Sequence, residues 1–155
     1  RPERMVPEEL AVYSAPRPVW LKVGFVDGGS DTNPMLTSQV DNDGLRQALT
    51  ATLAAAGLAN AEADVADTFR VDVSLMGLSQ PVFGFDFTVE STIFYRVTSE
   101  SDNRELFAES ISAAGVAEVS DAFYGTERLR IANEFSIQEN LRFFVERLIN
   151  LIQTI

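Results

Sequence analysis

Apolar and polar residues alternate along four stretches of the chain, and this period of two predicts four β-strands. The stretches cover residues 19–26, 69–75, 83–97 and 105–119. One face of each is apolar, which is typical of an antiparallel sheet that covers a core on one side. The predicted core-facing residues are Val19, Leu21, Val23 and Phe25; Phe69, Val71, Val73 and Leu75; Phe83, Phe85, Phe87, Val89, Ile93, Tyr95 and Val97; and Phe107, Ile111 and Ala113.

Two of these strands carry signs of irregularity. The alternation over 83–97 is so long that we expect strong twist or a bulge within it. In the last strand Gly115 interrupts the pattern, and an isolated strand glycine often marks a bulge.

A period near 3.6 predicts a first helix between the first two strands. Asn42 and Asp43 are candidate caps at its start, and it runs to about Ala56 and stops at Gly57. Its expected packing face consists of Leu45, Ala48, Leu49, Thr52, Leu53 and Ala56.

The second helix closes the chain. Thr126 is its candidate cap, Glu127 suits the helix dipole in the first turn, and the helix reaches about Ile152. A helix this long should span the whole sheet. Its broad apolar stripe consists of Leu129, Ala132, Phe135, Ile137, Leu141, Phe144, Val145, Leu148, Leu151 and Ile152.

The order β-α-β-β-β-α predicts an α+β fold, a two-layer sandwich. We expect a mainly antiparallel four-stranded sheet with two helices packed on one face. Residues 19–155 form this single domain. Residues 1–18 hold four of the six prolines and form either an extended tether or a leader ordered along the domain surface.

Composition narrows the possible functions. The 155 residues are 46% hydrophobic, enough for a substantial core, yet no apolar run approaches the length of a transmembrane segment. The formal charge of −11 disfavours binding to nucleic acid and to anionic lipid surfaces. The chain opens with Arg1-Pro2, so we expect any targeting signal to lie upstream.

The chain contains neither cysteine nor histidine. Disulfides, thiol nucleophiles, zinc sites of the usual type and histidine-dependent triads are therefore excluded. Asp86 and Glu90 lie four residues apart on one strand face, which favours a solvated surface over a shared proton. Lys22 has no predicted enclosed pocket, and residues 41–44 lack the ligand spacing of a calcium loop. We predict a non-enzymatic protein without a cofactor, with a carboxylate-based hydrolase as a remote alternative.

Several apolar residues lack an evident core partner, and these are the candidate partner-binding residues. Met35 and Leu36 lie in the long polar loop 27–41, where they either contact a partner or fold back onto the core. The other candidates are Trp20 and the end of the last helix, namely Leu148, Leu151 and Ile152. A row of Phe83, Phe85 and Phe87 leaves open a pocket for a lipid tail.

The chain resembles small proteobacterial envelope lipoproteins, such as the lipopolysaccharide-assembly lipoprotein and the auxiliary lipoproteins of ABC-type lipid transporters. The resemblance rests on the element order over residues 19–152 and on four stretches. These are Pro16-Arg17-Pro18, Leu45-Arg46-Gln47-Ala48-Leu49, the strand 84–97 and Gly125-Thr126-Glu127-Arg128-Leu129.

This resemblance implies a lipid anchor on a cysteine upstream of Arg1, a periplasmic location with anchoring to the outer membrane, and a role in assembling or gating a transport complex. Our leading prediction is a non-enzymatic envelope lipoprotein domain that binds a protein partner. The alternative is a periplasmic carrier of lipid or another hydrophobic ligand.

Overall fold

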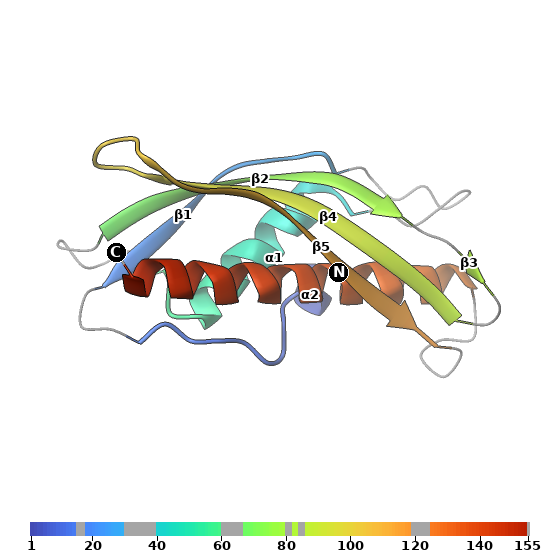
Figure 1. Ribbon diagram of the computed structural model, residues 1–155. Helices are drawn as coiled ribbons and strands as arrows, with labels where there is room; N and C mark the ends of the chain where they lie inside the picture. The colour runs from blue at the N-terminus through green and yellow to red at the C-terminus, as the bar shows by residue number, and fades with distance from the viewer. Residues whose placement is uncertain are drawn as a thin grey trace.

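A computed structural model describes residues 1–14, 18–29, 40–59, 67–79, 82–83, 86–118 and 125–154, and Figure 1 shows their arrangement. The elements in chain order are the 3₁₀-helix η1 (Pro2–Arg4), β1 (Val19–Asp27), α1 (Asn42–Ala55), β2 (Asp67–Ser79), β3 (Val82–Phe83), β4 (Asp86–Ser99), β5 (Glu105–Ala117) and α2 (Gly125–Thr154).

The four long strands lie in the order β1-β2-β4-β5. β1 runs parallel to β2, and the other pairs are antiparallel. Because both helices lie on one face of this sheet, the predicted α+β two-layer fold is confirmed (Figure 1). The stretch predicted as one strand from residue 83 is in fact two strands, since Val82 and Phe83 form the short β3 and pair back onto β4.

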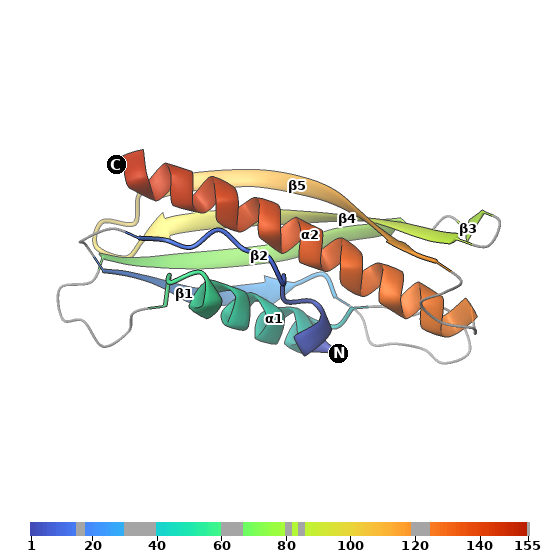
Figure 2. The same cartoon turned by 90° about the horizontal axis from the view of Figure 1, so that it is seen from below.

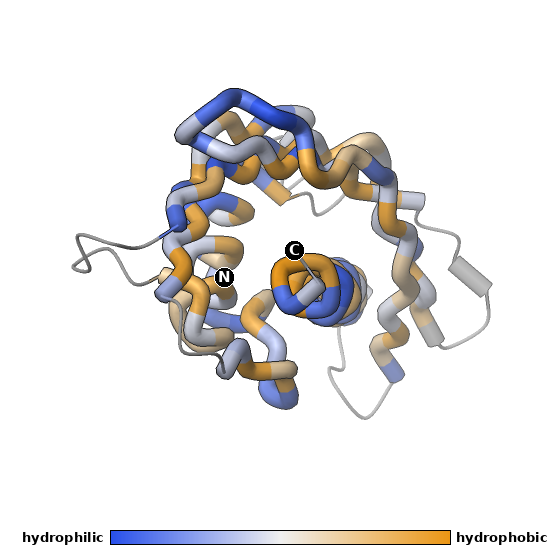
Figure 3. Tube along the Cα trace, turned by 60° about the vertical axis from the view of Figure 1, so that its left-hand side comes forward, coloured by the Kyte–Doolittle hydropathy of each residue, from blue (hydrophilic) through white to orange (hydrophobic). Residues whose placement is uncertain are grey.

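The sheet curves around α2, which is seen nearly end-on in Figure 3. The long helix therefore buries apolar side chains around more of its circumference than a helix on a flat sheet would. Near the middle of the sheet, the rings of Tyr95 and Phe144 stack with centroids 4.0 Å apart. Within the described residues, no helix combines the length and apolar content of a membrane span.

α2 packs closely against β5 at Gly115. A Cβ atom at this position would overlap the backbone nitrogen of Ser136 and would lie 2.7 Å from the carbonyl oxygen of Ala132. β5 is regular around Gly115, since its one register irregularity lies opposite Val97 and Thr98. The bulge predicted at Gly115 is therefore wrong, and the glycine is required by the helix that packs on the strand.

A buried polar network joins α2 to β4 and β5. The Asn140 side chain accepts a 2.6 Å hydrogen bond from the Tyr95 hydroxyl, and it donates to the carbonyl of Ile111 at 2.8 Å. The hydroxyl of Ser91 donates to the Ser136 carbonyl at 3.2 Å. Tyr95, Asn140, Ser91 and Ser136 all have polar side chains and are buried. Their hydrogen bonds offset the cost of removing these polar groups from water.

The helix starts differ from the predicted caps. Asp41 is the N-cap of α1, and its carboxylate accepts the amide hydrogen of Gly44 at 2.6 Å. Asn42 and Asp43 lie inside the first turn. Thr126 also lies within its helix, because α2 begins at Gly125. Each error shifts the start by one or two residues, within the usual uncertainty of a helix end.

The leader residues 1–14 lie along the helical layer, between α1 and α2 (Figure 2). Met5 is only 3% exposed, and the Arg1 guanidinium bonds both carboxylate oxygens of Glu134, at 3.0 and 2.6 Å. Farther along, the Tyr13 amide donates to the backbone of α1's C-cap at 2.7 Å. Of the two possibilities left open by the sequence, this part of the leader follows the second and packs on the domain.

Candidate protein-binding face

The face of the sheet that points away from the helices carries exposed apolar side chains, and an irregularity in β1 produces one of them. Val23 pairs with Val71 and Val26 pairs with Val73, so β1 has one residue more than β2 between these pairs. This bulge turns Phe25 outward, where it is 61% exposed. The prediction that Phe25 faces the core is therefore wrong, because Val26 takes that place.

Side chains from neighbouring elements hydrogen-bond the backbone groups of the bulge in β1. The amide of Phe25 donates to the Asp72 carboxylate at 2.6 Å, and the carbonyl of Gly24 accepts from the Arg46 guanidinium of α1 at 2.6 Å. A Cβ atom on Gly24 would overlap the Asp72 carboxylate and would lie 2.8 Å from the Arg70 side chain. The outward position of Phe25 is thus fixed by groups from both neighbouring elements.

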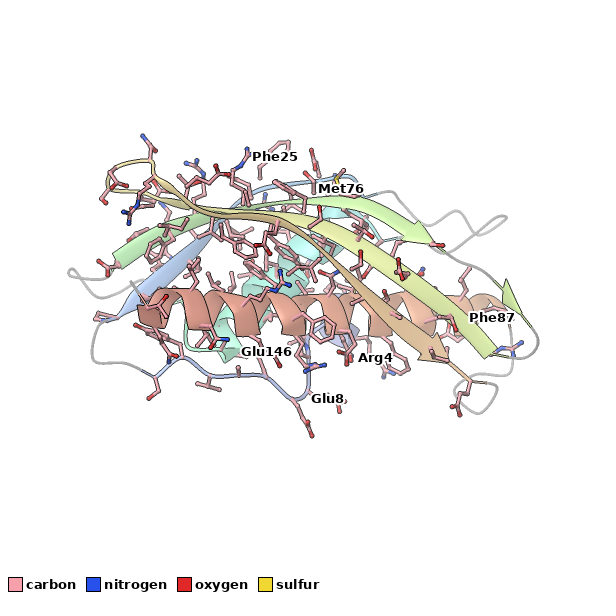
Figure 4. The ribbon with its side chains drawn as sticks, viewed as in Figure 1. Arg4, Glu8, Phe25, Met76, Phe87 and Glu146 are labelled. Carbon is pink, nitrogen blue, oxygen red and sulfur yellow. The ribbon has the colours of Figure 1, made fainter. Side chains whose placement is uncertain are left out.

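A second bulge lies in β2. Leu75 pairs with Ile93 and Gly77 pairs with Thr92, which leaves Met76 without a partner in β4. Met76 is 65% exposed, and Figure 4 shows it on the same side of the sheet as Phe25. Two adjacent strands therefore each turn one large apolar side chain to solvent on the same face.

A shallow depression of about 470 Å³ is lined in part by Phe25. We call its lining residues the outer-face patch: Phe25, Arg70, Asp72, Ser74, Phe94 and Arg96. The Arg96 guanidinium lies 5.5 Å from the centre of the Phe94 ring. The patch thus places two aromatic rings and two guanidinium groups around one opening.

Carboxylates partly balance the two arginines of the outer-face patch. Arg70 pairs with Asp72 at 3.1 Å and lies 3.9 Å from Glu100, while Arg96 pairs with Glu105 at 3.2 Å. Side-chain exposures of 40% for Arg70 and 53% for Arg96 leave both guanidinium groups accessible. Exposed ion pairs of this kind contribute little stability and rearrange at small cost.

Trp20, a predicted partner-binding residue, is half-buried in β1 next to the solvent-exposed Lys22. The Lys22 ammonium lies 5.1 Å from the centre of the Trp20 ring. Trp20 pairs with Thr68 of β2, next to the row that contains Arg70. Trp20 and Lys22 therefore extend the outer-face patch along β1 by an aromatic residue and a cation.

The end of α2 is arranged differently from the prediction. Leu148 and Ile152 are core residues, 0% and 2% exposed, and Leu151 is half-buried. The reason is the curvature of the sheet, since a helix enclosed on several sides buries more than one stripe (Figure 3). Leu148 and Ile152 are thus not a surface for a partner in the folded chain. The predicted candidates Met35 and Leu36 lie outside the described residues.

Sequence reasoning missed Phe25, Met76 and Phe94 as candidate site residues. Two of them stand beside a strand glycine, Gly24 or Gly77, and an isolated glycine in a strand pattern is a recognised bulge signal. Among the described residues, no group of three or more acidic side chains is placed to hold a metal ion. This face presents aromatic rings and guanidinium groups.

Another depression, of about 260 Å³, lies between the leader and the two helices. Arg1 and Met5 border it from the leader, Asp41 and Asp43 from the start of α1, and Glu134 from α2. Its most buried carboxylate, Glu134, is already held by Arg1, and this hydrogen bond raises the pKa of the Arg1 guanidinium. The space therefore serves the docking of the leader.

The fold is similar to those of several solved bacterial proteins. A Xanthomonas campestris protein of the family DUF330 superposes with a TM-score of 0.64 at 14% identity, covering 96% of both chains. A predicted lipoprotein from Caulobacter crescentus gives 0.57 at 13% identity, over 86% of this chain and 90% of the other. A minor lipoprotein from Acinetobacter baumannii gives 0.51 at 11% identity, over 85% and 91%.

At these identities the likeness establishes a shared fold, and two of these three proteins are described as lipoproteins. No protein-family model matches the chain, and no curated protein matches it in sequence.

Proposed function

We propose that this chain is the periplasmic domain of an outer-membrane-anchored lipoprotein, and that it binds a protein partner of a cell-envelope or transport complex without catalysing a reaction. The contact is made by the outer-face patch together with Trp20 and Met76. The observation that carries the proposal is that Phe25 and Met76, each located at a strand bulge, are exposed on one face of the sheet.

The composition of this face favours a protein partner. Aromatic residues, methionine and arginine are enriched at protein interfaces, and a few such residues contribute most of the binding energy. Phe25, Phe94 and Met76 supply apolar area, while Arg70 and Arg96 supply directional hydrogen bonds. Strand bulges are also over-represented next to functional sites, where they reorient a side chain.

The envelope assignment draws on the fold. Two of the similar structures are described as lipoproteins, of Caulobacter crescentus and Acinetobacter baumannii. A lipid anchor would lie on a cysteine upstream of Arg1. Because the leader packs between the helices, such an anchor would emerge on the helical side, and the outer-face patch would face away from it (Figures 2 and 4).

The alternative function, a hydrophobic-ligand carrier, would need space between the sheet and the helices. Tyr95 and Phe144 fill the middle of that layer with stacked rings, and the Asn140 network lies beside them. Phe87, one of the three phenylalanines considered for a lipid pocket, lies under the Arg128 guanidinium at 4.8 Å. Protein binding is therefore the function that we favour.

Site-specific photo-crosslinking in the native cell envelope tests the binding face. A photo-reactive residue at position 25 or 76 should give a discrete covalent adduct with another protein. The matched control is position 146, where Glu146 is exposed on the helical side of the molecule (Figure 4). Adducts from position 146 with none from positions 25 and 76 would contradict the proposal.

The anchor is tested separately, on the full-length precursor expressed in its own cells. The mature protein should fractionate with the outer membrane, and its intact mass should include acyl chains on an N-terminal cysteine. A mature protein without lipid in the periplasmic fraction would remove the anchor and leave the binding face to be judged by crosslinking.

Met35 and Leu36 give a further test of the binding surface. Replacing both with Ser should weaken capture of the partner and leave the free energy of unfolding nearly unchanged. A loss of several kcal/mol would instead show that they fold back onto the core.

A further inference from the structure

The two edges of the sheet differ in whether another segment of the chain pairs with them. At the β1 edge, the amide of Leu21 donates to the Leu58 carbonyl at 2.7 Å, and Trp20 forms an isolated bridge with Ala59. At the other edge, β5 pairs with β4 along nearly its whole length. Among the described residues, no segment pairs with the opposite side of β5.

β5 carries Glu105 and Glu109 but otherwise lacks the features that usually protect an open edge. Its 13 residues contain no proline and no lysine, and its pairing with β4 is regular from Phe107 to Ala117. Natural sheets normally blunt such an edge with charge, proline, bulges or a covering loop, because unpaired backbone groups recruit another strand. The open edge of β5 can therefore accept a partner strand.

The side chains of β5 indicate which strand fits. On the outer face, Ala108, Ser110, Ser112 and Ala114 are exposed and are arranged symmetrically about Ile111. In an antiparallel pair of two β5 strands centred on Ile111, Ser110 of one copy would lie opposite Ser112 of the other. Ala108 would lie opposite Ala114 in the same way. Serine and alanine pairs are compatible across two strands, and small side chains allow close approach.

The helix-side face of β5 carries no charge conflict in this register. Phe107 would lie opposite Gly115, whose own helix-side space is filled by the α2 backbone, and Glu109 would lie opposite Ala113. No like charges face each other directly. Glu109 is in addition ion-paired with Arg147 of its own chain. A twofold arrangement about Ile111 thus has no charge clash between opposed residues.

From this juxtaposition we propose that β5 is a self-association surface. Two copies of the chain pair through β5 in antiparallel orientation, with the twofold axis at Ile111, and form one continuous sheet of eight long strands. The interface repeats the same residues from both copies, as a twofold dimer requires. The outer-face patches then lie on the same face of the joined sheet and present two copies of the partner-binding surface.

The mass of the chain in solution is the first test. Sedimentation equilibrium over the micromolar range should give twice the 17.0 kDa mass of one chain. Ser110→Asp with Ser112→Asp places carboxylates opposite each other at the axis, and the dissociation constant should rise about tenfold or more. The control is Thr88→Asp on β4 with Ser74→Asp on β2, which introduces the same charge on the same face away from the edge.

Crosslinking tests the register without added charge. Because residues 1–155 contain no cysteine, Ser110→Cys and Ser112→Cys can be introduced singly into differently tagged copies of this domain. Mild oxidation of the mixture should link the two tags much faster than it links either variant to itself. Thr88→Cys should form no link.

Three outcomes would overturn the proposal. A native chain that stays monomeric throughout the range would do so. So would a dimer that neither the paired aspartates nor the cysteine register affects. A monomer that crosslinks from position 112 to a different protein in cells would assign the edge to a strand of that protein instead.

Discussion

The two faces of the sheet are built from the same strands, yet they follow different packing rules. On the concave face, Tyr95 is fully buried and its hydroxyl is bonded to Asn140. On the outer face, Phe25 and Met76 are more than half exposed, and Phe25 would have faced the core in a regular strand. The difference shows that stability is concentrated on the concave face and that the outer face bears a cost that folding alone does not require.

Three strand glycines provide the sharpest form of this comparison. Gly24 and Gly77 each stand at a bulge next to an outward-facing apolar residue, whereas Gly115 lies under α2 in a regular stretch of β5. The same residue type therefore serves the outer face twice and the concave face once. Substitutions at these positions separate the two roles.

The largest effect is expected for Gly115→Ala. The added Cβ would overlap the backbone of α2, which has no side-chain freedom to give way, so the free energy of unfolding should fall by about 3–4 kcal/mol. Gly77→Ala is the matched control, because no atom lies within 4 Å of a Cβ there, and its effect should stay within about 0.5 kcal/mol. Equal losses in urea unfolding would contradict the close approach of α2 to β5.

Asn140→Leu should be the next most costly change, at about 2–3 kcal/mol. It leaves the Tyr95 hydroxyl and the Ile111 carbonyl buried without this partner. Tyr95→Phe alone should cost about 1 kcal/mol. In the double variant the loss should be smaller than the sum, because the two side chains bond each other. Strict additivity in this double-mutant cycle would show that the bond contributes nothing.

Alkaline pH should affect the concave face specifically. Burial raises the pKa of Tyr95 well above its ordinary value of 10.0, so the unfolded chain releases this proton before the folded one does. The contribution of the protonated Tyr95 to the free energy of unfolding is fully present below pH 10.0. It decreases as the pH rises further, by up to about 1.4 kcal/mol per pH unit. Urea unfolding at increasing pH should show a shallower decrease for Tyr95→Phe, and identical slopes would refute the assignment.

Gly24→Ala should have a moderate effect, about 1 kcal/mol. Its Cβ would meet the ends of the Asp72 and Arg70 side chains, which shift more easily than a helix backbone. We expect the bulge to distort and the hydrogen bond from Phe25 to Asp72 to lengthen. The measurement is thermal unfolding together with amide exchange at Phe25, which should accelerate. An unchanged exchange rate would show that the bulge does not depend on this glycine.

Much of the concave face was predictable from the sequence, because the period of two in β2 and in β4 from Phe87 onward and the period of 3.6 in α1 directly follow burial. The sequence did not distinguish the glycines. Gly115 was predicted to mark a bulge. Phe25 was predicted to face the core, because a one-residue insertion in a strand reverses which face the following residues point to, and the alternation before the insertion gives no sign of it. The curvature that buries Leu148 and Ile152 is equally invisible in a local pattern, since it depends on how the whole sheet twists.

The outer face was harder to predict than the core for a physical reason. An exposed apolar residue is of the same residue type as a buried one. Only the register with the neighbouring strand shows which of the two it is. Trp20 was identified because it stands opposite a regular apolar alternation. Phe25 and Met76 were not, because each sits in the single position where its strand is irregular.

The most direct test of the outer face as a binding surface compares stability with capture in the double variant Phe25→Ser, Met76→Ser. Its free energy of unfolding should lie within about 0.5 kcal/mol of the native value, because both side chains are mostly exposed. Its capture of the protein that crosslinks to position 25 or 76 in the cell envelope should fall at least about tenfold. Undiminished capture by this folded variant would contradict the account.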